Sequence, residues 1–381
     1  MREPGYPAAH AVAARVEAHF AGQLAAARER GDDDLAPLPD ARAVEAMLDA
    51  AFWASLRREE SYAPTISLAF VPPERARRPL RFERRLPLLA GSLARLAPAV
   101  ERPGIHLGVW RDGDQLHVWG ATRTLPTLCF VLEVVAPGIL VVKHRRGQDA
   151  GKFVNVGVLE GDQIKIVDER ATMLPGCPPV VESLLGLGRR TSSDDDEPLN
   201  VPMQLAVSVR AHRRGGALLV VPVGSEAWRE SIVRPVFYSL VPAVSDVAEL
   251  MQSEPAERAR LEWQEALRRA VDALAGLTAV DGATVINDRY ELLAFGAKLK
   301  RRDAFDQVEQ VLVTEPIEGA IMTIVDPTEL GGTRHLSAAQ FVHDQRDSVA
   351  LVASQDGRFT VFAWSETDRI VRAHRIEALL M

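Results

Sequence analysis

Two short motifs in the last third of the chain carry residue types that can handle phosphate. Asp281 opens the triplet DGA, and the run GGTRHLSAA occupies residues 331–339. The second motif leads into AAQFV, where we expect a helix to begin because apolar residues recur at helical spacing. A helix N-terminus offers unpaired N–H groups and the positive end of a dipole, and glycine lets a ligand approach the main chain. The pattern predicts a phosphate site, to which Arg334 and His335 add charge and protons.

The segments around these motifs predict the elements that position them. Apolar residues three and four apart predict a helix that starts at residues 253–255 and ends shortly before Asp281. After the DGA triplet, TVINDRYELLAFGA predicts a strand, a turn and a second strand. An apolar run at 217–221 is typical of a buried strand, and the helix expected before it ends at two glycines. Residues 225–250 have no regular pattern. Helices that alternate with strands predict an α/β domain with a mixed sheet.

Taken together, the two motifs resemble those of the diadenylate cyclase family, a DisA-type nucleotide-cyclase domain whose marks are DGA and GTRHR. The matching residues are Asp281, Gly282, Ala283, Gly332, Thr333, Arg334 and His335. Leu336 stands where the family has a second arginine. GGALLVVP at 215–222 resembles the family's first core strand, and VALVASQDGRFTVF at 349–362 resembles its closing hairpin. The resemblance extends over residues 198–375.

This resemblance implies that the second half of the chain condenses two ATP molecules into cyclic di-AMP and releases two pyrophosphates. Each ribose 3′-hydroxyl would attack the α-phosphate of the other ATP, so two such domains must meet face to face in a homodimer or a higher homo-oligomer. Phosphoryl transfer depends mainly on positioning and on neutralising charge. The implied cofactor is Mg²⁺ or Mn²⁺.

The resemblance also implies a role for each motif residue. Asp281 would bind the metal ion or draw the proton from the 3′-hydroxyl, and Arg334 and His335 are the other catalytic candidates. The implied nucleotide contacts are Gly282, Ala283, Gly332, Thr333, Arg334, His335 and Ser337. Arg334 would hold the triphosphate through forked, charge-assisted bonds. Asp356 is a second metal candidate, although Asp-Gly at this position also suits a hairpin turn.

The residues leave alternatives open for this half of the chain. Asp281 before a glycine is also typical of a strand-entry turn, Thr333 of a plain helix N-cap, and Arg334 of a solvated first-turn residue. Leu336 lacks the charge of the family's arginine, and Val280 stands where some members carry a metal-binding histidine. A degenerate cyclase domain that senses ATP or cyclic di-AMP is therefore the alternative function, and a scaffold that only dimerises is another. The sequence has no GxGxxG, GxxxxGK[ST], HExxH or GxSxG signature of other enzymes.

The first half of the chain predicts a separate α+β domain. We expect helices over residues 8–30 and after Asp40, which can cap the second helix. The alternation in TISLAF at 65–70 predicts a half-buried strand, and arginine-rich 75–85 predicts a solvated connection. Hairpin patterns between 104 and 168 predict a small antiparallel sheet.

No catalytic motif accompanies these elements. His106, His117 and His144 fall singly on separate expected strands, without the spacing that marks metal sites. In its arrangement this half resembles the sensor domains that precede diadenylate cyclase domains, so we expect an unknown signal ligand or partner protein to bind there.

Composition and a polar stretch set the domain limits. A short helix is expected over 178–188, and RRTSSDDDEP at 189–198 has the character of a linker. We therefore expect a sensor domain at 1–190, a linker at 191–198 and a cyclase-like domain at 199–381.

Charge and hydropathy exclude several classes of partner. The 381 residues carry 45 basic and 52 acidic side chains, a net charge of −7, which argues against a nucleic-acid-binding surface. Cys129 and Cys177 suggest neither a disulfide framework nor a structural zinc. No apolar run is long enough to span a membrane and no signal peptide is evident, so we expect a cytoplasmic protein without membrane contact.

Overall fold

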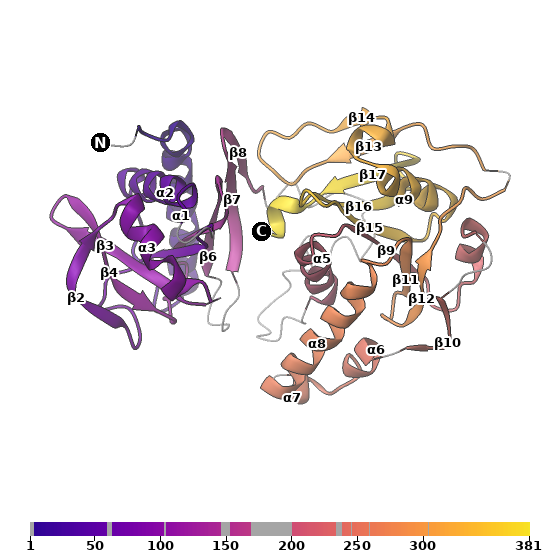
Figure 1. The fold of residues 1–381 in the computed structure, drawn as a ribbon, viewed down its shortest axis with the longest axis horizontal. Helices are drawn as coiled ribbons and strands as arrows, with labels where there is room; N and C mark the ends of the chain where they lie inside the picture. Colours follow the sequence, from indigo (N-terminus) through magenta and orange to yellow (C-terminus); the bar gives the residue numbers. More distant parts are fainter. Residues whose placement is uncertain are drawn as a thin grey trace. The chain divides into compact units, whose positions relative to one another are not determined.

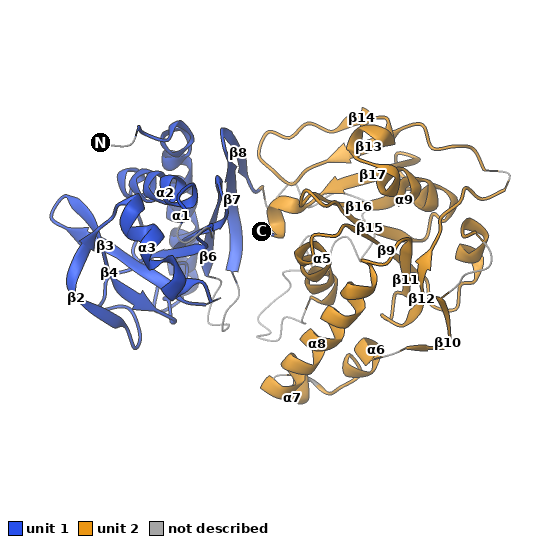
Figure 2. Ribbon diagram, viewed as in Figure 1, with its two compact units in different colours: residues 1–167, 381 blue, residues 168–380 orange. Residues whose placement is uncertain are grey.

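The computed structural model describes residues 4–58, 63–102, 104–145, 153–168, 200–233, 238–244, 246–258, 260–303 and 305–381. The chain divides into two compact units, residues 1–167 with 381, and residues 168–380 (Figure 2). The linker expected at 191–198 and the helix expected at 178–188 lie outside the described residues. Within the described ranges, no helix combines the length and the hydropathy needed to cross a membrane.

In the first unit, the described residues form three helices and an eight-stranded sheet (Figure 1). The helices are α1 (Pro7–Arg30), α2 (Ala41–Ser55) and α3 (Ala90–Val100). The strands are β1 (Ile66–Phe70), β2 (Leu80–Pro87), β3 (His106–Asp112), β4 (Gln115–Thr122), β5 (Phe130–Ala136), β6 (Ile139–Arg145), β7 (Phe153–Glu160) and β8 (Gln163–Ile166). Their order in the sheet is β2-β4-β3-β1-β5-β6-β7-β8. The sheet is mostly antiparallel, as expected, and β1 and β3 are its one parallel pair among the described strands.

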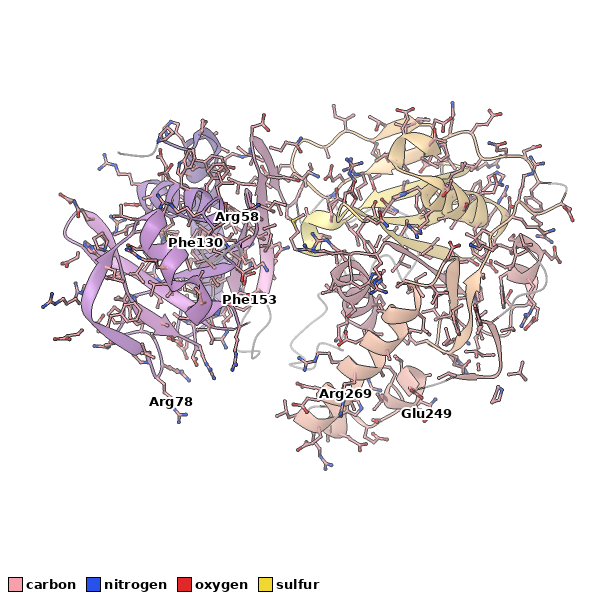
Figure 3. All side chains as sticks on the ribbon, in the orientation of Figure 1. Arg58, Arg78, Phe130, Phe153, Glu249 and Arg269 are labelled. Atoms are coloured by element: carbon pink, nitrogen blue, oxygen red, sulfur yellow. The ribbon has the colours of Figure 1, made fainter. Side chains whose placement is uncertain are left out.

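The three helices cover one face of this sheet. Alternate strand residues point to opposite faces, and Leu68 and Leu132 belong to the same buried cluster as the helices. Phe130 of β5, labelled in Figure 3, is fully buried, and its ring lies 5.4 Å from that of Phe20 on α1. A second, smaller cluster that includes Ala69 fills the other face. β1 is therefore buried on both faces and not half-buried as its alternation predicted.

Local signals explain where the first helices begin and end. Gly31 adopts a left-handed φ of 79° and its N–H donates to the carbonyls of Ala27 and Arg28, which ends α1. The carboxylate of Asp40 accepts a hydrogen bond of 2.8 Å from the N–H of Ala43, as the sequence predicted for an N-cap.

The arginine-rich segment was interpreted wrongly. Residues Leu80–Pro87 form the edge strand β2, which pairs with β4 and is largely exposed. Charged side chains are typical of an edge strand because they discourage pairing with another chain. α3, which follows β2, was not predicted at all.

In the second unit, the described residues form a nine-stranded mixed sheet with helices on both faces. The helices are α5 (Val201–Ala211), α6 (Asp246–Leu250), α7 (Pro255–Arg258), α8 (Leu261–Leu277) and α9 (Thr333–Asp344), with 3₁₀ turns at Ala227–Ser231, Pro327–Leu330 and Glu377–Leu379. The strands are β9 (Gly216–Val221), β10 (Tyr238–Val244), β11 (Ala283–Asn287), β12 (Leu292–Ala297), β13 (Val311–Thr314), β14 (Thr323–Val325), β15 (Val349–Ala353), β16 (Phe359–Ser365) and β17 (Ile370–Arg375). Their order is β10-β12-β11-β9-β15-β16-β17-β13-β14.

Two clusters of apolar side chains hold this sheet between its helices. α5 and α8 pack on one face, where Trp263, Leu267, Val271 and Leu274 supply the buried stripe of α8. α9 packs on the other face through Ala338, Phe341 and neighbouring residues and lies near β15 to β17 in Figure 1. The α/β class expected from the sequence is confirmed.

Three details of this unit differ from the sequence-based expectation. The helix expected from residue 253 is two helices, α7 and α8. α5 ends at Ala211, ahead of the two glycines at 215 and 216. The irregular segment 225–250 contains the edge strand β10 and the short helix α6.

Candidate functional site

Four neighbouring strands bring the two motifs to one end of the second sheet. β9 and β11 run parallel, with Ala217 opposite Ala283. β12 and β15 run antiparallel to them, with Ala297 opposite Ala283 and Ala353 opposite Gly216. The starts of β9 and β11 therefore lie beside the ends of β12 and β15. The DGA triplet, which precedes and begins β11, shares this end with the turn that follows β15.

The carboxylate of Asp281 is exposed at this end of the sheet. Lys298, the residue after β12, forms an ion pair with it and donates a hydrogen bond from Nζ to Oδ2. The hydrogen bond and the charge of Lys298 hold the pKa of Asp281 below its ordinary value, and the charge of Arg334 lowers it further. Asp281 is therefore ionised at neutral pH, as a base or a metal ligand must be.

Arg334 links the second motif to the first. A Cβ atom added at Gly215, just before β9, would lie 2.9 Å from Nη1 of Arg334 and 3.2 Å from the carbonyl oxygen of Ala353. The guanidinium thus lies at the start of β9 and the end of β15, and its charge reaches Asp281. With the other described residues Arg334 forms no hydrogen bond or ion pair. Its N–H donors are available to an anion.

His335 lies beneath this surface. The residue is 3% exposed, and its ring contacts that of Phe362 at a centroid distance of 6.1 Å. A Cβ atom at Gly331 would lie 2.5 Å from Nδ1 of His335, so the ring leaves room only for glycine there. The opposite ring nitrogen, Nε2, is buried without a hydrogen-bond partner. His335 therefore supports the first turn of α9 from below.

Burial also decides the charge of this ring. Desolvation lowers the pKa of His335; Asp356 opposes the shift, and the charges of Arg358, Arg334 and Arg375 reinforce it. Burial therefore favours the neutral form of the ring, and the contribution of His335 to phosphate binding stays a prediction. The positive charge comes from Arg334 and from two residues that the sequence did not single out, Arg358 and Arg375. Arg358 lies in the turn between β15 and β16, where it pairs with Asp356, and Arg375 ends β17, where it pairs with Glu377.

Gly282 has a structural reason to be glycine. Its φ is +117°, and a Cβ atom there would lie 2.5 Å from the carbonyl carbon of Gly296 in β12. Side chains rarely adopt this φ, and the main chain of β12 leaves no space for one. Close packing of two strands thus accounts for this glycine without a ligand.

The remaining motif residues are spread over exposed and buried positions. Gly332 is the N-cap of α9, and no side chain caps the helix, so Thr333 is not an N-cap but an exposed first-turn residue. Ser337 is partly buried one turn further along α9. Ala283 is 2% exposed and packs in the core under α9, which excludes a nucleotide contact by its side chain. Leu336 packs against the same core, so an apolar environment suits the residue that replaces the family's arginine.

Asp356 is part of the turn between β15 and β16. Its carboxylate accepts a hydrogen bond of 3.3 Å from the N–H of Arg358 and forms an ion pair with the guanidinium of the same residue. Burial opposes ionisation, but these contacts and the Ser354 hydroxyl together lower the pKa of Asp356. The turn accounts for the position of this carboxylate. Within the described ranges, no three His, Cys, Asp or Glu side chains are grouped so that they could hold a metal ion.

Residues 33–123 match a family described as "Probable sensor domain DACNV". The match lies within the first unit and runs from the residues before α2 to the end of β4. The N-terminal unit therefore contains a probable sensor domain. A search of curated proteins found no match to the chain.

The first unit carries a polar cluster on the sheet face opposite its helices. Ser67 Oγ and His106 Nδ1 lie 2.7 Å apart on β1 and β3, and Lys143 Nζ donates to Glu133 Oε2 over 2.6 Å between β6 and β5. Burial lowers the pKa of His106 to about 4, with Glu133 opposing and Lys143 reinforcing the shift. His106 is therefore a neutral, hydrogen-bonded residue of the fold.

Proposed function

We propose that the second unit is a diadenylate cyclase that condenses two ATP molecules into cyclic di-AMP and two pyrophosphates. The position of Arg334 carries this proposal. Arg334 belongs to the second motif, yet its guanidinium lies at the start of β9. Its charge lowers the pKa of Asp281 in the first motif. The two motifs are separated in the sequence by the four strands β11 to β14 and a 3₁₀ turn, yet both lie at one end of the sheet.

The positive side chains at this end suit a triphosphate. Arg334 offers its N–H donors, and the first turn of α9 has no side-chain cap and begins at a glycine. Anions bind at such helix starts because the N–H groups and the helix dipole face them. Arg358 and Arg375 also lie near His335, but each pairs with a carboxylate, Asp356 and Glu377 respectively, so Arg334 is the main cation of the proposed site. We assign the triphosphate to the surface between Arg334 and the first turn of α9.

Asp281 is the acidic group of the proposed site. Lys298 occupies its Oδ2, which leaves Oδ1 to take the proton of the 3′-hydroxyl or to hold a metal ion. Mg²⁺ commonly binds through one or two carboxylates with phosphate oxygens and water completing its shell, and a site with one exposed carboxylate beside a triphosphate fits that pattern. Bound there, Mg²⁺ or Mn²⁺ would neutralise charge on the phosphates.

Each cyclase unit in this proposal binds one ATP. The 3′-oxygen of each nucleotide forms a bond to the α-phosphorus of the other, the bond to pyrophosphate breaks, and the hydroxyl proton leaves. Because both attacks need nucleotides that face each other, the working form is at least a dimer of second units.

A nucleotide-sensing module is the second candidate. Leu336 favours it, because this side chain packs against the apolar core and supplies no charge to a phosphate. Under this reading, Arg334 and Asp281 hold ATP or cyclic di-AMP without joining two nucleotides.

Incubation of the full chain with ATP and Mg²⁺ or Mn²⁺, followed by mass spectrometry of the products, tests the proposal. We expect cyclic di-AMP from the parent and none from Asp281→Asn or Arg334→Ala. Arg289→Ala is the matched control, since Arg289 is an exposed arginine in the turn at the opposite end of β11. It should retain the parent's rate.

Two results would change the conclusion. If no product forms but ATP or cyclic di-AMP raises the melting temperature of the parent and not of Arg334→Ala, the unit is a sensing module. If neither nucleotide has any effect, both candidate functions are wrong.

A further inference from the structure

Helix α5 contacts two segments that border the proposed nucleotide site. His212, the C-cap of α5, has its Nε2 3.0 Å from Oγ1 of Thr278, which caps the end of α8 shortly before Asp281. On the other side, Arg210 donates from Nε to the carbonyl oxygen of Gly357, over 2.9 Å, in the turn after β15. α5 is the first described element of the second unit.

The environment of Arg210 is unusual for a helix side chain. A second donor, Nη1, lies 3.3 Å from the carbonyl oxygen of Leu380, so one guanidinium joins the turn to the last residues of this unit. Burial lowers the pKa of Arg210, and the charge of Glu377 opposes that shift. Glu377 is itself 5% exposed and accepts a hydrogen bond of 3.0 Å from Arg375. Charges held away from water are costly unless they are paired and hydrogen-bonded.

The turn that Arg210 contacts is closed by its own hydrogen bonds, and Arg210 ties its tip to α5. Ser354 and Arg358 close it with a main-chain hydrogen bond of 2.9 Å, and Gly357 adopts a φ of +90°. A glycine carries no side chain to pack, so its position depends on what its main chain binds. The N–H of Gly357 donates to the carbonyl oxygen of Ser354 within the turn, over 3.3 Å, and the bond from Arg210 to the carbonyl oxygen of Gly357 is an anchor from outside the turn.

Both this turn and the guanidinium of Arg334 approach Gly215. A Cβ atom at Gly215 would lie 2.9 Å from Arg334 Nη1 and 3.4 Å from Cγ of Gln355 in the turn. Gln355 also donates to the carbonyl oxygen of Arg214, over 3.4 Å. A shift of the turn would therefore change the surroundings of the guanidinium that we assign to phosphate.

We propose that Arg210 is a positioning residue for the nucleotide site: it anchors the turn at Gly357 and thereby fixes the place of Arg334. The inference rests on the proposed function for its effect on ATP, whereas the anchoring of the turn stands independently of any activity. Displacement of a phosphate-binding group by about an ångström can cost tens to hundreds of fold in rate.

The test compares the full chain with Arg210→Ala, Arg210→Lys and Ser208→Ala. Ser208 lies on the same helix and donates to Asp272 of α8 over 2.6 Å, so Ser208→Ala removes an α5 contact that does not involve the turn. We expect Arg210→Ala to lower kcat about tenfold or more with a smaller change in KM for ATP. Arg210→Lys should recover part of the loss because its ammonium still reaches one carbonyl, and Ser208→Ala should match the parent.

Hydrogen–deuterium exchange of the nucleotide-free proteins gives a readout that does not depend on activity. Amides of residues 355–358 should exchange faster in Arg210→Ala than in the parent and in Ser208→Ala. Unchanged exchange in this turn, or parent-like kcat in Arg210→Ala, would overturn the inference. If the parent makes no cyclic di-AMP while the exchange effect appears, the cyclase proposal fails and the anchoring of the turn holds.

Discussion

Lys298 and Asp281 form an ion pair across the paired strands β11 and β12, between the residue after β12 and the residue that opens the DGA triplet. The two residues are 17 positions apart in the sequence, and antiparallel pairing alone brings them together. Lys298 lowers the pKa of the Asp281 carboxyl and so extends its ionised form to lower pH.

Replacement of Lys298 by Met should therefore raise the pKa of Asp281 toward its ordinary value. A carboxylate with a lowered pKa stays ionised to lower pH, so in Lys298→Met the acid limb of the rate against pH should move to higher pH. Lys300→Met is the control, since Lys300 pairs with Asp303 at 3.7 Å and not with Asp281. Superimposable profiles for the parent and Lys298→Met would contradict this role of the ion pair.

The two motif glycines should respond differently to alanine. Gly282→Ala places a Cβ atom 2.5 Å from the main chain of Gly296 at a φ of +117°, so we expect the second unit to lose roughly 2 kcal/mol or more of its free energy of unfolding. Gly332→Ala meets no atom within 4 Å, and its φ is −75°, so it should unfold like the parent. Urea titration of both variants checks this, and equal midpoints would show that the contact with Gly296 is relieved without cost.

Acid should destabilise both units through buried histidines. Burial lowers the pKa of His106 and of His374 to about 4 in the folded protein, with Arg372 adding to the shift of His374. Above the ordinary pKa of about 6.5, neither the folded nor the unfolded state binds the proton. Between about pH 6.5 and about pH 4, only the unfolded state binds the proton. As the pH falls through this range, each histidine should therefore lower the free energy of unfolding by about 1.4 kcal/mol per pH unit.

Unfolding free energies measured between about pH 7 and pH 5 check this dependence. His106→Gln should make the unfolding free energy of the first unit depend less steeply on pH. His374→Gln should do the same for the second unit. A slope that is the same in all three proteins would assign the acid sensitivity to other groups.

Restoring the family's arginine at position 336 should not restore charge to the site. Leu336 packs against the core under α9, so Leu336→Arg must bury or expel a charged side chain and should cost about 1–3 kcal/mol of unfolding free energy. Leu336→Met conserves volume and should change stability by less than about 1.5 kcal/mol. Thermal unfolding with and without ATP distinguishes the outcomes. Tighter ATP binding by Leu336→Arg at unchanged stability would show that this side chain reaches the phosphate surface.

Features that depend on neighbouring residues were predicted correctly. Asp40 caps α2. The hairpin of β3 and β4 has its turn between the paired residues Asp112 and Gln115. Both features need only a few consecutive residues. The strand, turn and strand after the DGA triplet and the closing hairpin of β15 and β16 are confirmed for the same reason. The sequence also sufficed for the α/β class.

Features that depend on distant partners were missed. The arginine-rich strand β2 has no apolar alternation and exists because β4 pairs with it. TISLAF suggested one buried face, but β1 lies between β3 and β5 in the middle of the sheet, where both faces are covered.

The candidate site likewise has features that the sequence predicted and features that only the folded chain shows. The resemblance of the DGA and GTRH motifs to the diadenylate cyclase family selected Asp281 and Arg334, and their role at a nucleotide stays a prediction. The burial of His335, the ion pair of Lys298 with Asp281 and the anchoring of Gly357 by Arg210 required the folded chain. Burial and charge pairing are set by which strands and helices pack together, and residues far apart in the sequence make those contacts.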